Sequence, residues 1–446
     1  MFALCEVFYD CFQVKYSYFI LKIRSNFASS NFNRMKNMQN ETPKAKGFTR
    51  YQAFVIAALA LLQFTIVMDF QIIMPLGDML VRGLSIDTAQ FGLLVSCYAF
   101  GAGIMGALAS IVADRFDRKK LLIFFYTGFI LGTLICGFSH SYRMLMVARS
   151  ITGLFGGVIA SISIAIVSDL FAMNRRGRAM SYIQMAFSVS QVLGLPAGIL
   201  IANRWGWNAT FLSIVALAGV VWIAVMVGFR PIVEHKKLQT SENVLRRLWR
   251  VLSTRSYLTG FVLLTFVALA GAMIMPFSAT FLINNAGVSQ QQLPLVYIFT
   301  GAAIIIAMPV IGHLCDRVDK YRLFVIGSLL SVVMTVVFTH LVSVPLWTVI
   351  IINIVMLVGL SSGSVSGMAL ITAIPSPGDR GSYMSLGESL QLMANGVGTI
   401  LAGLIIVQHG ESTPLEHFDR VGYVVAAVSI ACTLLLYRID RVTKRG

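Results

Sequence analysis

Charged side chains are scarce in this chain of 446 residues, of which only 12% are Asp, Glu, Lys or Arg. A soluble protein carries about 25%, so the scarcity excludes a sizeable soluble domain. The hydrophobic residues, 57% of the total, gather instead in long uncharged runs. A helix needs ~20 mainly apolar residues to cross a bilayer. Twelve such runs occur, at residues 53–76, 89–113, 120–138, 143–169, 179–202, 210–229, 257–283, 292–314, 322–342, 346–373, 382–407 and 420–437. The sequence therefore predicts an all-α membrane protein with twelve transmembrane helices.

Several familiar functional patterns are also missing. The six cysteines are scattered without a CxxC pair, and the six histidines are dispersed, so neither residue type indicates a metal site. No Gly-rich phosphate loop ending in Lys-Ser or Lys-Thr occurs, which argues against an ATP-driven pump. We therefore expect no enzyme activity, no cofactor and no metal.

Basic residues outnumber acidic ones, 35 to 19, and their positions favour lipid over nucleic acid. If both termini are cytoplasmic and the helices alternate in direction, 30 of the 35 lie in cytoplasmic tails and loops. This distribution is the positive-inside pattern of membrane proteins, and such loops attract anionic lipid headgroups. We therefore predict cytoplasmic termini, a plasma-membrane location, a bilayer as surroundings and no nucleic-acid partner.

A charged linker at 230–256 divides the runs six and six, and the two halves resemble each other. Three segments recur in the same order at offsets of 201 to 204 residues: IMPL at 73 as IMPF at 274, DRFDRK at 114 as DRVDKY at 316, and RGRAMSYIQ at 176 as RGSYMSLGE at 380. Parallel six-helix repeats characterise one architecture of membrane transporters. The predicted parts are six-helix pseudo-repeats at 51–229 and 257–437 and cytoplasmic tails at 1–50 and 438–446.

The first 34 residues do not fit this pattern. They mix aromatic side chains with Glu6, Asp10 and Lys15, and they lack the continuous apolar core of a signal peptide. The polar, basic segment that follows is typical of a cytoplasmic start. We expect Met35 to be the native first residue and 1–34 to be a start-site artefact; a disordered or membrane-surface tail is the alternative.

The recurring charged loop resembles the signature of the major facilitator superfamily, roughly G-x-x-x-D-R-x-G-R-[KR]. Residues 110–120, SIVADRFDRKK, match it except that Ser110 and Asp117 stand where glycine is usual. The second copy, GHLCDRVDK at 312–320, again has an acid, Asp319, at the second glycine position. The resemblance extends over residues 50–440 and implies transport by alternating access.

Two motifs within the helices strengthen the resemblance. RSITGLFGG at 149–157 is similar to the family's fourth-helix motif, a membrane-embedded arginine followed by small residues. GLPAGILIANRWGWNATF at 194–211 resembles the fifth-helix Gly-Pro motif of drug–proton antiporters and arabinose-efflux-like permeases, with a leucine inserted. The resemblance suggests a bending or sealing point at Gly194, Pro196 and Gly198; a tight helix crossing is the alternative.

Ionisable side chains inside membrane helices are costly and mark functional sites. Asp69 and Arg149 fall at similar depth in the outer halves of the first and fourth helices, which both line the central cavity in the resembled fold. We expect them to face each other there and to couple proton uptake to the conformational cycle; a static ion pair is the alternative. Glu388, which replaces Gln184 of the first repeat, suits proton relay, substrate contact or a polar interface equally.

The acids of the charged loop need an explanation, since they do not serve the positive-inside rule. In the resembled fold Asp114 would meet the positive end of the eleventh helix near Gly381 and Ser382, and Arg118 would reach Asp169. Contacts of this kind, worth ~1 kcal/mol each, would form a latch that breaks when the cytoplasmic side opens. The predicted latch comprises Asp114, Arg115, Arg118, Asp169, Asp316 and Arg317.

These patterns favour a monomeric secondary transporter that exports a small organic molecule, such as a drug or sugar, in exchange for protons. A mostly apolar cavity with one acid fits lipophilic cations, and neutral sugars remain open. Uptake of a sugar or carboxylate by symport is one alternative, and a non-transporting membrane sensor is another. The polar residues expected to line the cavity are Gln63, Gln184, Gln191, Asn353, Gln391 and Asn395.

Overall fold

A computed structural model describes residues 48–112, 116–230, 244–372, 374–376, 379–410 and 413–443. Over these residues the regular secondary structure is helical, apart from one isolated bridge between Val407 and Glu416. Residues 1–34, the expected start at Met35, and the latch residues Asp114 and Arg115 lie outside the described part.

The long helices form two sets of six. The first set is α3 (Arg50–Ile72), α5 (Thr88–Val112), α6 (Arg118–Gly137), α7 (Tyr142–Leu170), the continuous α8, η2 and α9 (Met173–Val189, Ser190–Gly194 and Leu195–Trp205) and α10 (Trp207–Gly228). The second set is α12 (Arg255–Asn284), α13 (Leu293–Arg317), α14 (Lys320–Thr339), α15 (Leu346–Ile371), α16 (Arg380–Ile405) and α17 (Phe418–Thr443). The predicted all-α fold of twelve helices in two repeats is confirmed.

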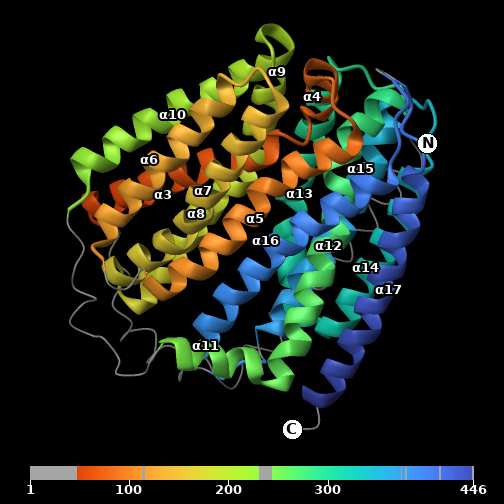
Figure 1. Cartoon of the computed structure of the whole chain (residues 1–446). Helices are drawn as coiled ribbons and strands as arrows, with labels where there is room; N and C mark the ends of the chain where they lie inside the picture. The colour runs from red at the N-terminus through yellow and green to blue at the C-terminus, as the bar shows by residue number, and fades with distance from the viewer. Residues whose placement is uncertain are drawn as a thin grey trace, which may run out of the picture. The chain divides into compact units, whose positions relative to one another are not determined.

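Two short helices lie outside this pattern. The short helix α4 (Gly77–Leu84) follows α3, and α11 (Val244–Ser253) precedes α12; Figure 1 shows them at opposite ends of the bundle. The apolar run at 53–76 was expected to be a single helix, but α3 ends at Ile72. Pro75 lies in the turn that follows, which is consistent with the tendency of helices to end at or before the residue preceding a proline, although Pro276 at the matching place of the second repeat lies inside α12.

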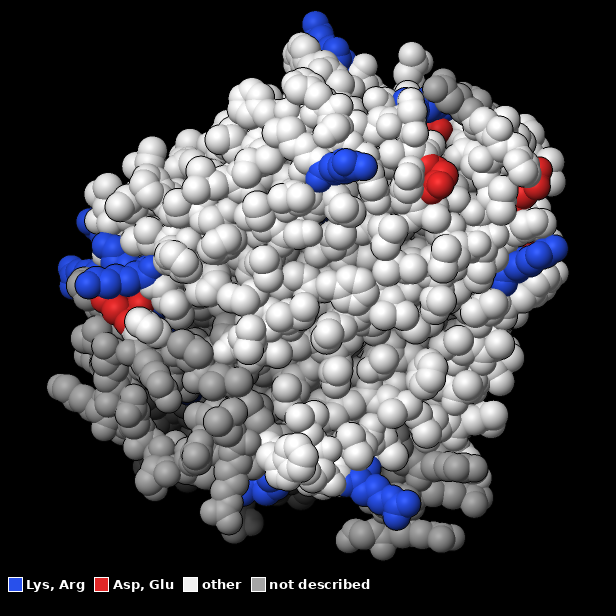
Figure 2. Space-filling view, in the orientation of Figure 1, with Lys and Arg blue, Asp and Glu red and all other residues white. Residues whose placement is uncertain are grey.

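Eleven described helices are long and apolar enough to cross a membrane. The remaining long helix, α16, is rich in Gly and Ser and carries Glu388, Gln391 and Asn395. It packs against α5 and α12. On the face shown in Figure 2 the charged side chains are few and lie mainly toward the margin, around a broad uncharged centre.

The main contact between the repeats is the crossing of α5 with α16 (Figure 1). Small residues bring the two backbones close: a Cβ on Gly92 would lie 2.9 Å from the Thr399 carbonyl oxygen. Two hydroxyls bond directly to the opposite backbone, Ser96 Oγ to Gly396 O at 2.8 Å and Thr88 Oγ1 to Ile406 O at 2.6 Å. Close backbone approach through small residues is a common way for membrane helices to pack.

Candidate functional site

A cavity of about 420 Å³ lies between the two repeats. It is lined by α3, α5 and the α8–α9 helix of the first repeat and by α12, α13, α15 and α16 of the second. None of the described residues that line it is Asp, Glu, Lys or Arg. Its hydrogen-bonding groups are seven hydroxyls and five carboxamides, the latter those of Gln71, Gln191, Asn353, Gln391 and Asn395. Such a lining offers donors and acceptors to a ligand but no countercharge.

Four of the six polar residues expected to line the cavity do so: Gln191, Asn353, Gln391 and Asn395. The expectation is wrong for Gln63 and Gln184, which lie outside the lining. Gln63 is eight residues before Gln71 on α3, about 12 Å along the helix axis. Gln184 is seven residues before Gln191, about 10 Å away by the same rise, and is exposed. Both therefore sit too far toward the other end of the bundle.

Among the polar lining groups that sequence reasoning missed, two carry an unpaired atom. The Oε1 atom of Gln71 and the hydroxyl of Thr300 are buried without a hydrogen-bond partner among the described residues. Leaving such an atom unpaired costs about 1–3 kcal/mol, so both are suited to accept or donate a bond when a ligand or water enters. In the sequence, the only indication that Gln71 lies near the cavity is its position two residues after Asp69. Nothing in the sequence indicates Thr300.

Asp69 and Arg149 form a fully buried ion pair, and both side chains are 0% exposed. Arg149 Nη1 donates to Asp69 Oδ2 at 2.8 Å and to the Asp69 backbone oxygen at 3.2 Å. Thr133 of α6 donates to the other carboxylate oxygen at 3.3 Å. The Nε and Nη2 atoms of Arg149 have no partner among the described residues. Both carboxylate oxygens of Asp69 therefore accept hydrogen bonds, whereas two of the three guanidinium nitrogens of Arg149 donate none to the described residues.

The sequence correctly predicted that this pair meets, but its predicted position in the cavity is wrong. Neither residue lines the cavity, and no described lining residue belongs to α7. The Arg149 guanidinium lies 4.6 Å from the centre of the Tyr98 ring, and Tyr98 packs on Phe70 with ring centres 5.1 Å apart. Because Phe70 itself lines the cavity, two packed aromatic rings, tilted by 36° to each other, lie between the ion pair and the cavity.

Glu388 lies three residues before Gln391 on α16, and this spacing places both on one helix face. Gln391 lines the cavity whereas Glu388 does not, and Glu388 is exposed. This carboxylate is therefore about one helical turn outside the cavity, nearer to the start of α16.

The acids at the unusual glycine positions of both charged loops are helix caps. Asp117 accepts a hydrogen bond from Lys119 N at the start of α6, and Asp319 accepts from Tyr321 N and Arg322 N at the start of α14. A carboxylate at this position satisfies free backbone donors. The Lys119 ammonium also donates to the backbone oxygens of Met226 and Phe229 at the end of α10. The lysine thus ties two helix ends together.

The latch residues divide into three groups. Arg118 lies 3.3 Å from Asp169, as predicted, but these residues begin α6 and end α7 of the same repeat. The pair therefore joins α6 to α7 within one repeat, and its part in a latch stays a prediction. Asp316 and Arg317 are both exposed at the end of α13. Asp114 and Arg115 lie outside the described residues, so their part in a latch stays a prediction.

A buried acid at the α4 end of the bundle does join the two repeats. Asp78 is 2% exposed and accepts from Asn284 Nδ2 at 2.9 Å and from Gln290 Nε2 at 2.8 Å. Its own neighbour Arg82 lies 2.6 Å away. Asn203, at the end of α9, donates to the Gln290 backbone oxygen at 3.1 Å. These contacts close this end of the bundle.

A second acidic cluster lies at the opposite end, where α16 begins. Arg250 of α11 donates to Asp379 at 2.8 Å, and Ser376 and Tyr257 donate to the other carboxylate oxygen at 3.1 and 3.4 Å. The hydrogen bond from Arg250, aided by Ser376 and Tyr257, holds the pKa of Asp379 below its ordinary value. The cluster fastens the linker helix to the second repeat.

The Gly-Pro motif follows a π-helical segment, Ser190–Gly194, inside the otherwise continuous helix. Pro196 lies just after this segment, in the first turn of α9. Since proline cannot donate a backbone bond, the wider π turn accommodates the residue without ending the helix. The side chain of Gln191, within the same segment, lines the cavity.

Twelve helices in two repeats around a central cavity define the class of secondary membrane transporters. Models of the family described as the major facilitator superfamily match residues 59–277 and 260–446. The chain therefore belongs to the major facilitator superfamily, and it is a multi-pass protein of the cell membrane and not an enzyme. The MFS-type transporter YbcL of Bacillus subtilis (strain 168) is 22% identical over 383 residues, which are 86% of this chain and 95% of YbcL.

Solved structures show the same fold. The nucleoside transporter NupG, solved as a point mutant, is similar with a TM-score of 0.71 at 14% identity, over 86% of this chain and 99% of NupG. A D-xylose–proton symporter has a TM-score of 0.71 at 15% identity, over 87% of this chain and 98% of its own. A bacterial homologue of the human lysosomal transporter Spinster, in an inward-facing and occupied conformation, has a TM-score of 0.70 at 17% identity. The match covers 89% of this chain and 98% of the homologue.

Proposed function

We propose that this transporter exports an uncharged small organic molecule in exchange for protons, by alternating access and as a monomer. The observation that carries the proton coupling is the buried pair of Asp69 and Arg149, one aromatic layer from the cavity. A buried carboxylate that meets a single arginine nitrogen can change its charge when the helices around it move, because its affinity for a proton depends on that distance.

The proposed coupling uses the two states of this pair. When Asp69 is ionised, its attraction to Arg149 holds α3 against α7. When Asp69 takes up a proton, that attraction falls and the unpaired Nε and Nη2 atoms of Arg149 can seek other acceptors. A proton therefore binds one helix arrangement better than the other. This difference in affinity couples proton binding to the movement of the helices. Glu388, near the cavity rim, is the proposed second proton-carrying group.

The distribution of basic residues supports cytoplasmic termini. Arg118, Arg176 and Arg250 lie in loops or helix ends that the alternating helices bring to one end of the bundle, and such ends stay in the cytoplasm. The Asp78 contacts close the opposite, outer end. We therefore propose that the described conformation is closed to the outside.

An uncharged substrate suits the cavity better than the lipophilic cation that the sequence first favoured. A buried cation needs a partner of opposite charge, and the only acid considered for that role, Asp69, is engaged by Arg149 outside the lining. Carboxamides and hydroxyls satisfy neutral polar molecules instead. Two structural neighbours, by their names, transport nucleosides and D-xylose, which are compounds of this chemical kind.

The test is transport by the purified protein in proteoliposomes across an imposed pH gradient, while substrate and internal pH are followed together. A panel of neutral glycosides and nucleosides is compared with cations of similar size. Export predicts proton movement opposite to substrate movement. Movement of both in the same direction establishes symport instead, and preferential transport of cations refutes the uncharged substrate.

A further inference from the structure

A second pocket adjoins the central cavity within the second repeat. It has a volume of about 470 Å³ and lies between α12 and α15, with single contributions from α14 and α16. Val267, Ser364 and Gln391 line both this α12–α15 pocket and the central cavity. The two spaces therefore adjoin each other along these three side chains.

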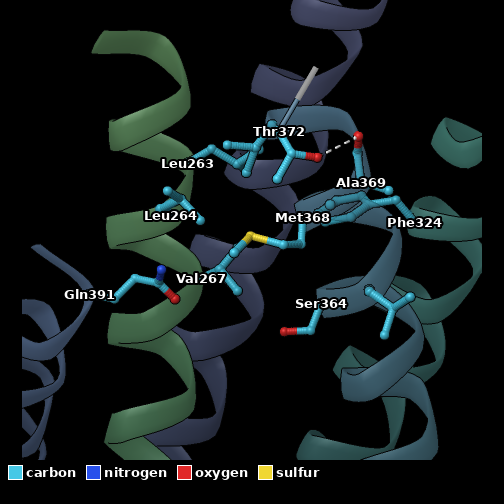
Figure 3. Close-up of a pocket in the computed structure, with 13 residues that line it drawn as sticks. Leu263, Leu264, Val267, Phe324, Ser364, Met368, Ala369, Thr372 and Gln391 are labelled. Carbon is cyan, nitrogen blue, oxygen red and sulfur yellow. Dashed lines mark hydrogen bonds between the residues drawn. The ribbon is translucent and has the colours of Figure 1, made fainter. Parts of the chain in front are cut away.

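The two spaces differ in their carboxamides, since five line the cavity and only the shared Gln391 lines the pocket. The pocket walls are mainly apolar, with Leu263, Leu264 and Phe324 almost fully buried. Figure 3 shows Met368 extending from α15 toward α12 across the pocket. The Thr372 hydroxyl, at the far end, is already bonded to the Ala369 backbone oxygen at 3.2 Å. Polar groups able to serve a ligand thus gather where pocket and cavity meet, at Ser364 and Gln391.

We propose that the α12–α15 pocket binds the apolar end of the transported molecule, while the carboxamides of the cavity hold its uncharged polar end. The proposal rests on the function proposed above. Its occupant follows from the three residues that the two spaces share and from the carboxamides, which line the cavity but, apart from the shared Gln391, not the pocket. Each buried methylene raises affinity about fourfold, so the pocket selects amphipathic molecules over purely polar ones of the same head group.

The pocket is also built to receive groups of different shape. Its deep wall is fixed, because Leu263 is 0% and Phe324 3% exposed and both pack in the core of the second repeat. Its mouth carries Met368, which is 37% exposed and has a flexible side chain that adapts to irregular contacts. A rigid wall with an adaptable mouth suits an apolar group that varies between substrates.

Protection of single cysteines tests the proposal. Met368→Cys reports on the pocket, Gln191→Cys on the cavity, and Met308→Cys, 39% exposed at a position outside both linings, is the matched control. The full chain, with its native cysteines replaced by alanine, is placed in phosphatidylcholine–phosphatidylglycerol vesicles. N-ethylmaleimide labelling is timed with ethyl or hexyl β-D-glucoside, both below the micelle-forming concentration.

The proposal predicts that hexyl glucoside slows the labelling of Met368→Cys by N-ethylmaleimide at least tenfold and that ethyl glucoside slows it only weakly. The labelling rate of Met308→Cys should be the same with either glucoside. Failure of hexyl glucoside to protect Met368→Cys overturns the proposal, whatever happens at Gln191→Cys. A Met368→Cys that is unreactive in vesicles without glucoside but reactive in detergent also overturns it, since a lipid chain then fills the pocket. Transport of glycosides by the unmodified protein is scored separately, so either claim can fail alone.

A second measurement avoids the cysteine replacements. In the chain with its native cysteines, hexyl glucoside should raise the thermal unfolding midpoint more than ethyl glucoside does. Ala369→Phe, which fills the pocket, should remove that difference, whereas Ala369→Ser should keep it. If hexyl glucoside still raises the unfolding midpoint of Ala369→Phe more than ethyl glucoside does, the proposal is contradicted.

Discussion

The carboxylate of Asp78 and the carboxamide of Gln290 join the two repeats 2.8 Å apart at the end of the bundle that holds α4. Asn284 adds a second bond from the same side. Alternating access requires the two repeats to separate at this end, so both bonds must break once in each cycle. The acid is therefore placed to set how often this end opens.

Replacing Asp78 with Asn should favour the state in which this end is open. Hydrogen bonds to a charged group contribute about 1.5–3 kcal/mol, so the population of the open state should rise at least tenfold. The measurement is labelling of a cysteine at Thr280, which is 2% exposed, by an impermeant maleimide added outside. Asp87→Asn is the matched control, because Asp87 is exposed and accepts from Gln90 N of its own helix end. Equal labelling rates in the two variants would refute this role for Asp78.

The Asp379 cluster predicts a pH dependence of stability. The pKa of Asp379 is lowered in the folded protein. The contribution of Asp379 to the free energy of unfolding is therefore present above its unfolded pKa of about 4 and is lost as pH falls through the lower folded pKa. Asp379→Asn should therefore unfold at a lower temperature than wild type at pH 7, and the two should converge below pH ~4. The exposed Asp316→Asn serves as control and should show no such convergence. A constant difference between Asp379→Asn and wild type from pH 7 to pH 3 would contradict the assignment.

The crossing of α5 and α7 depends on glycine. A Cβ on Gly153 would collide with the backbone of Tyr98, whereas a Cβ on Gly219 meets nothing within 4 Å. Gly153→Ala should therefore cost about 1–3 kcal/mol of unfolding free energy through overpacking. Gly219→Ala should be neutral or stabilising, since alanine favours helix over glycine. Thermal unfolding of both variants checks this, and similar midpoints would show that the α5–α7 crossing adjusts freely.

The sequence predicted the fold because hydrophobic runs, basic loops and repeated segments all carry information at fixed spacing. It also predicted the contact of Asp69 with Arg149, since helix rise alone brings them to similar depth. It failed to place that pair relative to the cavity. The separation is made by the rings of Phe70 and Tyr98, and a run of apolar residues does not reveal which aromatic stacks on which.

Other features depend on partners too distant in sequence to be recognised. Asp78 is 206 residues from Asn284 and 212 from Gln290, and each is an ordinary polar residue near a helix end. The acids at the loop glycine positions were noticed as a shared departure, yet their use as helix caps required the backbone geometry of Asp117 and Asp319.

The central claim is that proton coupling depends on the carboxyl group of Asp69. Removing one partner of a buried ion pair costs about 3–5 kcal/mol, so Asp69→Asn is accompanied by Asp69→Glu, which keeps the carboxyl group. Both variants are first compared with wild type by unfolding midpoint and by exchange of substrate across vesicles without a pH gradient.

The most direct measurement is the number of protons moved per substrate in proteoliposomes with an imposed pH gradient. Asp69→Asn should exchange substrate without net proton movement and should not accumulate it, whereas Asp69→Glu should retain coupling with a shifted pH dependence. Gradient-driven accumulation by Asp69→Asn at the wild-type ratio of protons to substrate would contradict the account.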